Sequence, residues 1–294
     1  MASKVLITGI SGFTGTHLRG TLEAKGYAVH GIAPTVSHPA DRVADLLDPP
    51  SLNHAVQAIA PDYVIHLAGV SSPAHDQPDL FRVVHEEGTR NLLEALMPGG
   101  GRLRKVILAS SAYVYGQPRR IPVLESAEPA PTTPYGESKL GMERMAVNWF
   151  DRLPLLIVRP FNYTGIGQSA TFVVPKLVNH FREKSPQIEL GDTSVIREFM
   201  DVRDVADLYA RLLECPLQSD VVNLCRGMGY PLSGLVEMMK RLSGHAPAIR
   251  HAAALNRVGE IRELVGSPKK LLEAVGKFDF RPLEQTLAWM LRGA

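Results

Sequence analysis

The chain has 294 residues, 45% of them hydrophobic and 21% charged, so it is long enough to bury a core as one large domain or as two closely joined ones. The net charge is only +2 and acidic and basic residues are interspersed, which argues against a nucleic-acid or membrane-surface partner. The two cysteines lie ten residues apart and the histidines show no metal-ligand spacing, which argues against a metal site.

The N-terminal segment MASKVLITG enters a strand pattern at once, which leaves no room for a signal peptide. No apolar stretch is long enough to span a bilayer. From these two observations we expect a soluble, cytoplasmic protein whose cysteines are reduced.

Short apolar runs alternate with segments of helical period over the first 160 residues. The expected strands are 4–8, 27–32, 63–67, 105–109 and 154–158, with a further short strand before residue 45. The expected helices are about 13–25, 51–60, 78–97 and 134–150. Because the strands are nearly continuous runs of Val, Ile and Leu, the sheet should be parallel and covered on both faces. We therefore predict a doubly wound α/β fold of the Rossmann type.

The pattern changes after residue 161, where the turn-rich loop NYTGIGQSAT begins. The elements expected beyond it are helices at about 171–183, from near 201, and at about 232–242, 267–275 and 283–291, and strands at 187–190 and 221–225. The predicted organisation is a dinucleotide-binding domain of residues 1–161 plus about 200–225. A smaller, mostly helical substrate lobe would comprise about 162–199 plus 226–294.

A glycine-rich turn follows the first expected strand, in the segment TGISGFTG. Glycines at this spacing permit a tight turn and a close approach of the backbone to a pyrophosphate, while the N-terminus of the next helix attracts the phosphate charge. The candidate coenzyme contacts in this turn are Gly9, Gly12, Phe13, Thr14 and Gly15.

The end of the second expected strand bears on the choice of coenzyme. A carboxylate there would bind the adenosine ribose and favour NAD, but this sequence has Ala33 and Pro34. His38 or Arg42 could reach a 2′-phosphate, although each is more often a plain surface residue. The missing carboxylate leads us to favour NADP over NAD.

Two further strand ends should lie at the same edge of the sheet. The segment DLLD could offer Asp45 and the backbone of Leu46 to an adenine, and HLAGV ends the 63–67 strand. Since both segments fall in register with the glycine turn, we include the following residues as candidate coenzyme contacts: Asp45, Leu46, Leu67, Ala68 and Gly69.

Three side chains form the candidate catalytic group. Tyr135 and Lys139 are four residues apart on an expected helix, hence on one face. A lysine ammonium beside a phenol favours the phenolate, and the same lysine could bind the nicotinamide ribose. Ser111 lies just after the 105–109 strand, where its hydroxyl can donate to a carbonyl oxygen while Tyr135 transfers the proton.

The chain resembles the short-chain dehydrogenase/reductases, because Ser, Tyr and Lys follow a Gly-x-x-Gly-x-x-Gly turn in this order. Its length and second region resemble the extended branch of that family, which acts on nucleotide sugars. In that branch the active hydroxyl lies five residues before the glycine of the YG pair, which selects Ser111 and leaves Ser110 a structural role. The resemblance covers nearly the whole chain. It also implies a homodimer, because helices 78–97 and 134–150 resemble those of the family's four-helix interface.

Three later segments carry the resemblance into the second region: RPFNYTGIGQ at 159–168, IREFMDVRDVADLY at 196–209 and RVGEIRELVGSPKKL at 257–271. The last is similar to a signature of the GDP-mannose dehydratase and GDP-4-keto-6-deoxymannose reductase group. By this resemblance, Pro160 would meet the nicotinamide. The implied substrate contacts are Asn162, Arg197 and Arg257 at the diphosphate, Glu260 at the nucleoside ribose, Phe172, Val173 and Lys176 at the nucleotide, and Ser72 and Ser111. Tyr113, for which the family offers no role, is expected to line the sugar pocket.

The residues after Ser111 restrict the reaction. Dehydratases of the family place an acidic residue there to remove a proton from C5, whereas this chain has Ala112 and Tyr113, so dehydration is not expected. A 4-ketoreductase that uses external NAD(P)H is favoured over a 4-epimerase that retains NAD. A catalytically silent NAD(P)-binding regulator is the third alternative. The expected product is GDP-D-rhamnose or GDP-6-deoxytalose, with UDP, CDP and dTDP left open as the nucleotide.

The chain departs from the family pattern at five positions. His85 stands where an asparagine usually steadies the active-site strand, and its charge could add a pH dependence. Tyr163 replaces a histidine and Ile166 a proline, while Glu198 replaces the commoner aspartate and Val258 a proline. None of these changes removes a catalytic group.

Overall fold

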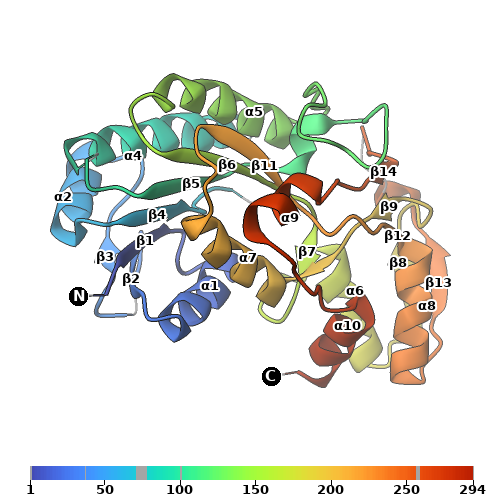
Figure 1. The fold of residues 1–294 in the computed structure, drawn as a ribbon. Helices are drawn as coiled ribbons and strands as arrows, with labels where there is room; N and C mark the ends of the chain where they lie inside the picture. Colours follow the sequence, from blue (N-terminus) through green and yellow to red (C-terminus); the bar gives the residue numbers. More distant parts are fainter. Residues whose placement is uncertain (1, 37, 71–77, 100, 256–258, 294) are drawn as a thin grey trace.

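The computed structural model describes residues 2–36, 38–70, 78–99, 101–255 and 259–293 (Figure 1). A parallel sheet of seven strands forms its centre, in the order β11-β6-β5-β4-β1-β2-β3. The strands are β1 (Lys4–Thr8), β2 (Ala28–Ala33), β3 (Arg42–Val43), β4 (Tyr63–His66), β5 (Lys105–Ala109), β6 (Leu155–Pro160) and β11 (Asp220–Leu224). The predicted doubly wound α/β fold is therefore confirmed.

Helices cover both faces of this sheet (Figure 1). One face carries α1 (Phe13–Ala24) and α7 (Val202–Glu214), and the other carries α2 (Pro49–Ile59), α4 (Gly88–Leu96) and α5 (Pro134–Ala146). Alternate side chains of each strand point to opposite faces, so Ile7 joins one buried cluster while Leu6 joins the other. This double burial explains why the strands read as continuous apolar runs.

The chain order places a crevice beside β1. From β1 the chain moves outward through β2 and β3, then returns to place β4 on the other side of β1. In open α/β sheets, ligands bind at the carboxyl ends of the strands where the strand order reverses in this way. The candidate site is therefore expected beyond the ends of β1, β4 and β5.

A third apolar cluster lies apart from the sheet and is built from α6 (Val173–Arg182), α8 (Leu232–Ser243) and α10 (Leu283–Arg292). Two-stranded pairs flank it: β8 (Gln187–Leu190) with β13 (Ala248–His251), and β7 (Tyr163–Thr164) with β10 (Met200–Asp201). A small sheet joins β12 (Tyr230–Pro231), β9 (Ile196–Arg197) and β14 (Glu263–Leu264), and α9 (Lys269–Val275) contacts α7 and β11. The two-domain boundaries given above stay a prediction.

The expected helix at 78–97 is interrupted. It comprises α3 (Pro78–Arg82), a π-helical turn η1 (Val83–Glu87), α4 and a 3₁₀ turn η2 (Met97–Gly99). The remaining short 3₁₀ turns are η3 (Ala112–Tyr115), η4 (Val147–Trp149) and η5 (Ala253–Leu255). Across the described ranges, no helix is long and apolar enough to cross a bilayer.

Candidate active site

A cavity of about 1110 Å³ opens at the carboxyl edge of the sheet and extends to α6, β8 and β9. Apart from His38 and Arg42, every candidate residue that falls in the described ranges lines it. These are Gly9, Gly12, Phe13, Thr14, Gly15, Asp45, Leu46, Leu67, Ala68, Gly69, Ser111, Tyr113, Tyr135, Lys139, Pro160, Asn162, Phe172, Val173, Lys176, Arg197 and Glu260. Ser72, Arg257 and Val258 lie outside the described residues. Segments far apart in the sequence therefore converge on one space.

The glycine turn between β1 and α1 fits an anionic group. Gly9 has φ +72°, and a Cβ there would lie 2.8 Å from the Ala68 amide nitrogen, so only glycine suits this position. A Cβ at Gly15 would lie 2.5 Å from the Gly9 carbonyl oxygen. Helix α1 has Gly12 as its N-cap, with no side-chain cap and no acidic residue in the first turn. Its N–H groups are thus available for the pyrophosphate of a nicotinamide coenzyme.

The adenosine end of the cavity carries no carboxylate from the end of β2. Ala33 and Pro34 line the wall there. The nearby Asp41 is not among the residues that line the cavity; its Oδ1 accepts the Gly31 N–H at 2.7 Å and pairs with Arg19. Arg42, one of the two side chains considered for a 2′-phosphate, instead donates to the Asp41 carbonyl oxygen at 2.9 Å.

Asp45 and Leu46 are held in a fixed turn beside α4. Asp45 Oδ1 accepts the Leu47 N–H at 2.9 Å, and Asn91 Nδ2 donates to the Leu46 carbonyl oxygen at 2.8 Å. His38, the other 2′-phosphate candidate, is not among the residues that line the cavity. The backbone of this turn, with the apolar Leu46 side chain, can offer an adenine both stacking area and polar contacts.

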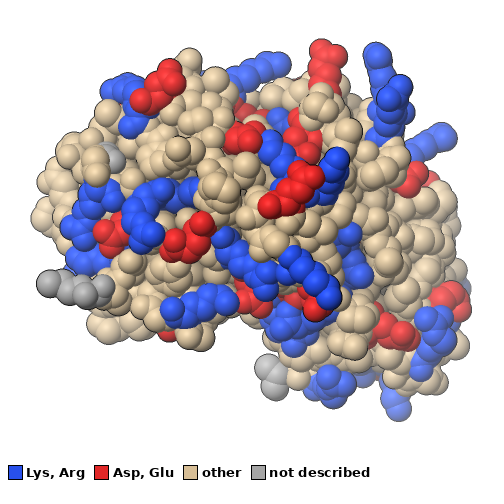
Figure 2. Space-filling model, viewed as in Figure 1, with Lys and Arg blue, Asp and Glu red and all other residues tan. Residues whose placement is uncertain are grey.

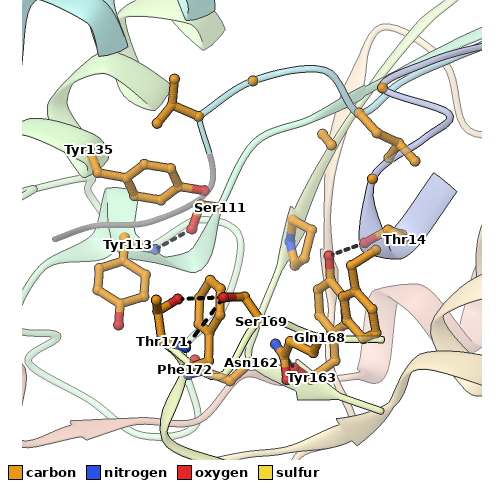
Figure 3. A pocket seen from close by; sticks show the side chains of 18 of the residues that line it. Thr14, Ser111, Tyr113, Tyr135, Asn162, Tyr163, Gln168, Ser169, Thr171 and Phe172 are labelled. Atoms are coloured by element: carbon orange, nitrogen blue, oxygen red, sulfur yellow. Dashed lines mark hydrogen bonds between the residues drawn. The ribbon is translucent and has the colours of Figure 1, made fainter. Parts of the chain in front are cut away.

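Ser111, Tyr135 and Lys139 meet at the inner end of the cavity. Ser111 follows β5 and caps η3, where its Oγ accepts the Tyr113 N–H at 3.2 Å. Helix α5 begins at Pro134 because Thr133 caps it, accepting the Gly136 N–H at 3.1 Å. This start puts Tyr135 in the first turn, with its hydroxyl close to that of Ser111 (Figure 3), and Lys139 one turn later.

Burial decides the proton state of this group. Burial raises the pKa of Tyr135, while the hydrogen bond from Ser111 lowers it by less, so the phenol keeps its proton in the free protein. Burial lowers the pKa of Lys139 to about 8, and the nearby Glu143 carboxylate opposes that shift. Lys139 Nζ donates to the Ala109 carbonyl oxygen at 2.8 Å, which keeps the ammonium at the end of β5.

A buried network of polar side chains lies next to the catalytic group and includes Ser110, Glu143 and Arg159. Ser110 Oγ donates to Glu143 Oε1 at 2.5 Å, and Arg159 donates to both carboxylate oxygens of Glu143, at 2.9 and 2.6 Å. Arg159 also donates to the Tyr115 hydroxyl at 2.9 Å. Ser110 thus faces this network, whereas its neighbour Ser111 faces Tyr135.

His85 lies in the π-helical turn η1 and packs against Tyr135. The two rings meet edge to face at 5.7 Å, and His85 Nδ1 lies 2.9 Å from Ser138 Oγ. Burial, with a smaller contribution from Lys139, lowers the pKa of His85 to about 2. The imidazole therefore stays neutral at physiological pH. The expectation that a charge on His85 adds a pH dependence is wrong.

The outer end of the cavity holds the residues expected at the substrate. Tyr113 is half-buried, meets the Tyr135 ring edge to face at 5.9 Å and lines the cavity together with Thr171 and Phe172. Arg197 and Glu260 pair with each other at 2.5 Å. An arginine next to a carboxylate in the wall of a cavity can hold a phosphate and a ribose diol side by side.

Some cavity residues were not identified from the sequence. Tyr163, Gln168, Asp192 and Leu255 line the cavity, yet none was among the candidates. Tyr163 and Gln168 belong to the motif RPFNYTGIGQ, and that motif is the sequence signal that points to them. Asp192 follows β8 and Leu255 is the last residue of η5, and neither belongs to a motif. In the described ranges, no cluster of three His, Cys, Asp or Glu residues could hold a metal ion.

Comparisons with known proteins agree with this geometry. The profile of the NAD dependent epimerase/dehydratase family matches residues 5–225. The GDP-6-deoxy-D-talose 4-dehydrogenase of Aggregatibacter actinomycetemcomitans is 32% identical over 279 residues, 95% of this chain and 92% of that protein. The GDP-6-deoxy-D-mannose reductase of Pseudomonas aeruginosa is 33% identical over 287 residues, 94% of this chain and 92% of that protein.

A solved structure shares the same fold. The structure of RMD from Pseudomonas aeruginosa complexed with NADPH has a TM-score of 0.87 to this chain at 32% sequence identity. The alignment covers 99% of this chain and 97% of that one. The bound NADPH of that relative agrees with the anion-binding turn described here between β1 and α1.

Proposed function

Because the chain belongs to the NAD dependent epimerase/dehydratase family, we propose that it reduces the C4 ketone of a nucleotide-linked 4-keto-6-deoxyhexose with NAD(P)H. The observation that carries the proposal is the convergence of Ser111, Tyr135 and Lys139 in one cavity beside the anion-binding turn. The favoured substrate is GDP-4-keto-6-deoxymannose, and the product is GDP-D-rhamnose or GDP-6-deoxytalose for deoxysugar and polysaccharide biosynthesis. The two GDP-sugar relatives, at 32% and 33% identity, support this choice.

The chain's own residues account for the polar steps. The bound coenzyme supplies the hydride to C4. The Ser111 hydroxyl donates a hydrogen bond to the ketone oxygen, and the protonated Tyr135 gives that oxygen its proton as negative charge develops. Lys139, charged below pH about 8, stabilises the tyrosinate that forms. Tyr135 is thus the general acid and Ser111 the polarising donor.

The place of Ala112 and Tyr113 supports a reaction that stops at C4. Ala112 is buried in η3, and Tyr113 presents a phenol to the cavity instead of a carboxylate. Removal of a proton from carbon calls for a stronger base than a neutral phenol. Dehydration is therefore not part of the proposed reaction.

The activity test combines substrate, coenzyme and variant. GDP-4-keto-6-deoxymannose is incubated with NADPH or NADH, and coenzyme oxidation is followed beside a verified reductase. Tyr135→Phe should abolish turnover while coenzyme binding is retained, whereas Tyr27→Phe, which removes a phenol bonded to Glu214 away from the cavity, should not. The absence of coenzyme consumption by the wild type would refute the substrate assignment.

The same assay separates the alternatives. A 4-epimerase would retain NAD through purification and consume no coenzyme, and a silent regulator would bind coenzyme without response to any nucleotide sugar. We favour NADP because the cavity wall at the end of β2 carries no carboxylate, and a carboxylate there would repel the 2′-phosphate of NADP. The ratio of kcat/KM for NADPH and NADH tests this choice.

The proposed assembly is a homodimer through the helices α3, α4 and α5. Helix α5 contacts both α3 and α4, and α4 and α5 pack on the same face of the central sheet. Multi-angle light scattering of the purified protein should give a mass twice that of the chain. A monomeric mass would refute the dimer and leave the proposed reaction untouched.

A further inference from the structure

Tyr163 joins the two halves of the cavity. It lies in β7, directly after Asn162, and its hydroxyl is 2.7 Å from Thr14 Oγ1 in the glycine turn (Figure 3). Its ring stacks on Phe13 of the same turn, with the ring centres 5.9 Å apart and the planes at 12°. One side chain from the substrate segment thus contacts two neighbouring residues of the coenzyme turn.

Further hydrogen bonds connect the segment around Tyr163 internally and to α1. Gln168 Nε2 donates to the Tyr163 carbonyl oxygen at 3.1 Å, and Thr164 Oγ1 donates to Gln168 Oε1 at 2.7 Å. A second link to α1 comes from His17, whose Nε2 lies 2.8 Å from the Ile166 carbonyl oxygen. Segment 162–168 is therefore attached to the first turns of α1, where the pyrophosphate is expected.

The direction of the Tyr163–Thr14 hydrogen bond is open in the free protein, since either hydroxyl can donate. A hydroxyl has one proton to donate and can accept two hydrogen bonds. An anion at the N-terminus of α1 would draw the Thr14 proton toward itself, leaving Thr14 Oγ1 to accept from Tyr163. Burial raises the pKa of Tyr163, so the phenol has a proton to give. Bonds aligned in one chain in this way strengthen one another.

We propose that Tyr163 couples the two binding steps, so that coenzyme on the glycine turn tightens the binding of the nucleotide sugar to segment 162–168. This inference rests on the proposed function in that it needs both ligands in one cavity. By linkage the effect is reciprocal, and the nucleotide must tighten coenzyme binding by the same factor.

The test measures that factor directly with ligands that do not react together. The dissociation constant of GDP is measured by calorimetry with and without saturating NADPH, for the wild type and for Tyr163→Phe. The coupling ratio is the dissociation constant of GDP without NADPH divided by the constant with NADPH. We expect this ratio to exceed one in the wild type. It should be about twofold to tenfold smaller in Tyr163→Phe, which keeps the ring stack and loses one hydrogen bond. Tyr27→Phe is the matched control and should keep the wild-type ratio.

A second variant tests the partner. Thr14→Val removes the accepting oxygen, and adding Tyr163→Phe to it should change the ratio no further, whereas independent roles would give additive changes. The proposal is overturned if Tyr163→Phe keeps the wild-type ratio, if the two changes add, or if the wild-type ratio is one. Failure of GDP to bind while UDP binds would refute the GDP assignment instead, and the same ratio measured with UDP then decides the coupling. If coenzyme does not bind at all, the proposed function fails first and the coupling with it.

Discussion

Lys139 is a buried ammonium whose proton the proposed reaction needs. Burial lowers its pKa to about 8, from the usual lysine value of 10.5. Because the charged form stabilises the tyrosinate, activity should be full below this value and decline as the pH rises through it. We expect kcat/KM, which reports the free enzyme, to fall with a midpoint near pH 8.

The Glu143→Gln variant provides the control for this assignment. The Glu143 carboxylate opposes the lowering of the Lys139 pKa, so its removal should move the alkaline decline of kcat/KM to lower pH. A decline that stays in place, or moves upward, would mean that another group titrates there.

The neighbouring serines should separate catalysis from stability. Ser111→Ala removes the hydroxyl proposed to donate to the ketone oxygen and should lower kcat about a hundredfold, as loss of one donor to a developing oxyanion does. Ser110→Ala removes a donor to Glu143 and should leave kcat within a few-fold of wild type while lowering the melting temperature. Equal kcat losses in both variants would contradict the assignment.

At the scale of elements, α5 is tied to β6 by the ion pair of Glu143 and Arg159. Both side chains are buried, about 6% exposed each, and they share two hydrogen bonds. Glu143→Gln leaves the arginine charge poorly compensated in the interior and should cost about 3–5 kcal/mol of unfolding free energy, measured by urea denaturation. Replacement of both residues by apolar side chains, Glu143→Leu with Arg159→Met, should recover most of this loss. A double variant less stable than Glu143→Gln would argue against the pair as the cause.

The elements show what local patterns predict and where they fail. The strands at 4–8 and 105–109 agree with the structure, because a buried parallel strand has a composition of its own. The helix predicted at 78–97 contains the π-helical turn η1, which periodicity does not reveal. In that turn His85 is held by Ser138 and by its contact with Tyr135, and both partners come from α5, more than 45 residues away. The conformation is set by tertiary packing, and so local sequence does not encode it.

At the scale of the molecule, Glu198 joins two backbone turns that are distant in the sequence. Its carboxylate accepts the N–H groups of Arg226, Gly227 and Gly266, which belong to the turns after β11 and β14. Burial raises its pKa from 4.5 to about 7. The folded protein therefore holds this proton more tightly than the unfolded chain between these values, and this group's contribution to stability declines as the pH rises from about 4.5 to 7.

Urea denaturation across that pH range checks the contribution of Glu198. A shift of this size corresponds to at most about 3 kcal/mol of unfolding free energy. The Glu198→Gln variant, although less stable overall, should lose this part of the pH dependence. A variant with the wild-type pH dependence would show that other groups cause it.

The candidate site was predictable where chemistry and motif coincide. The glycine turn, Ser111, Tyr135 and Lys139 carry recognisable spacing, and the structure brings them to one cavity. The pairing of Arg197 with Glu260 and the bond between Tyr163 and Thr14 join positions 63 and 149 residues apart. Such contacts depend on how the second region folds over the sheet. The residues adjacent in sequence to each partner therefore do not predict the pairing.

The buried pair of Glu143 and Arg159 has a consequence for how this chain can vary among its relatives. Loss of one charge leaves the other charge buried without a partner, which destabilises the fold. A homologue in which one of the two positions changes should therefore soon change at the second position or revert. Across the family, the two positions should therefore vary together. Within one genome, a single substitution at either should be found mainly in copies that are losing the fold.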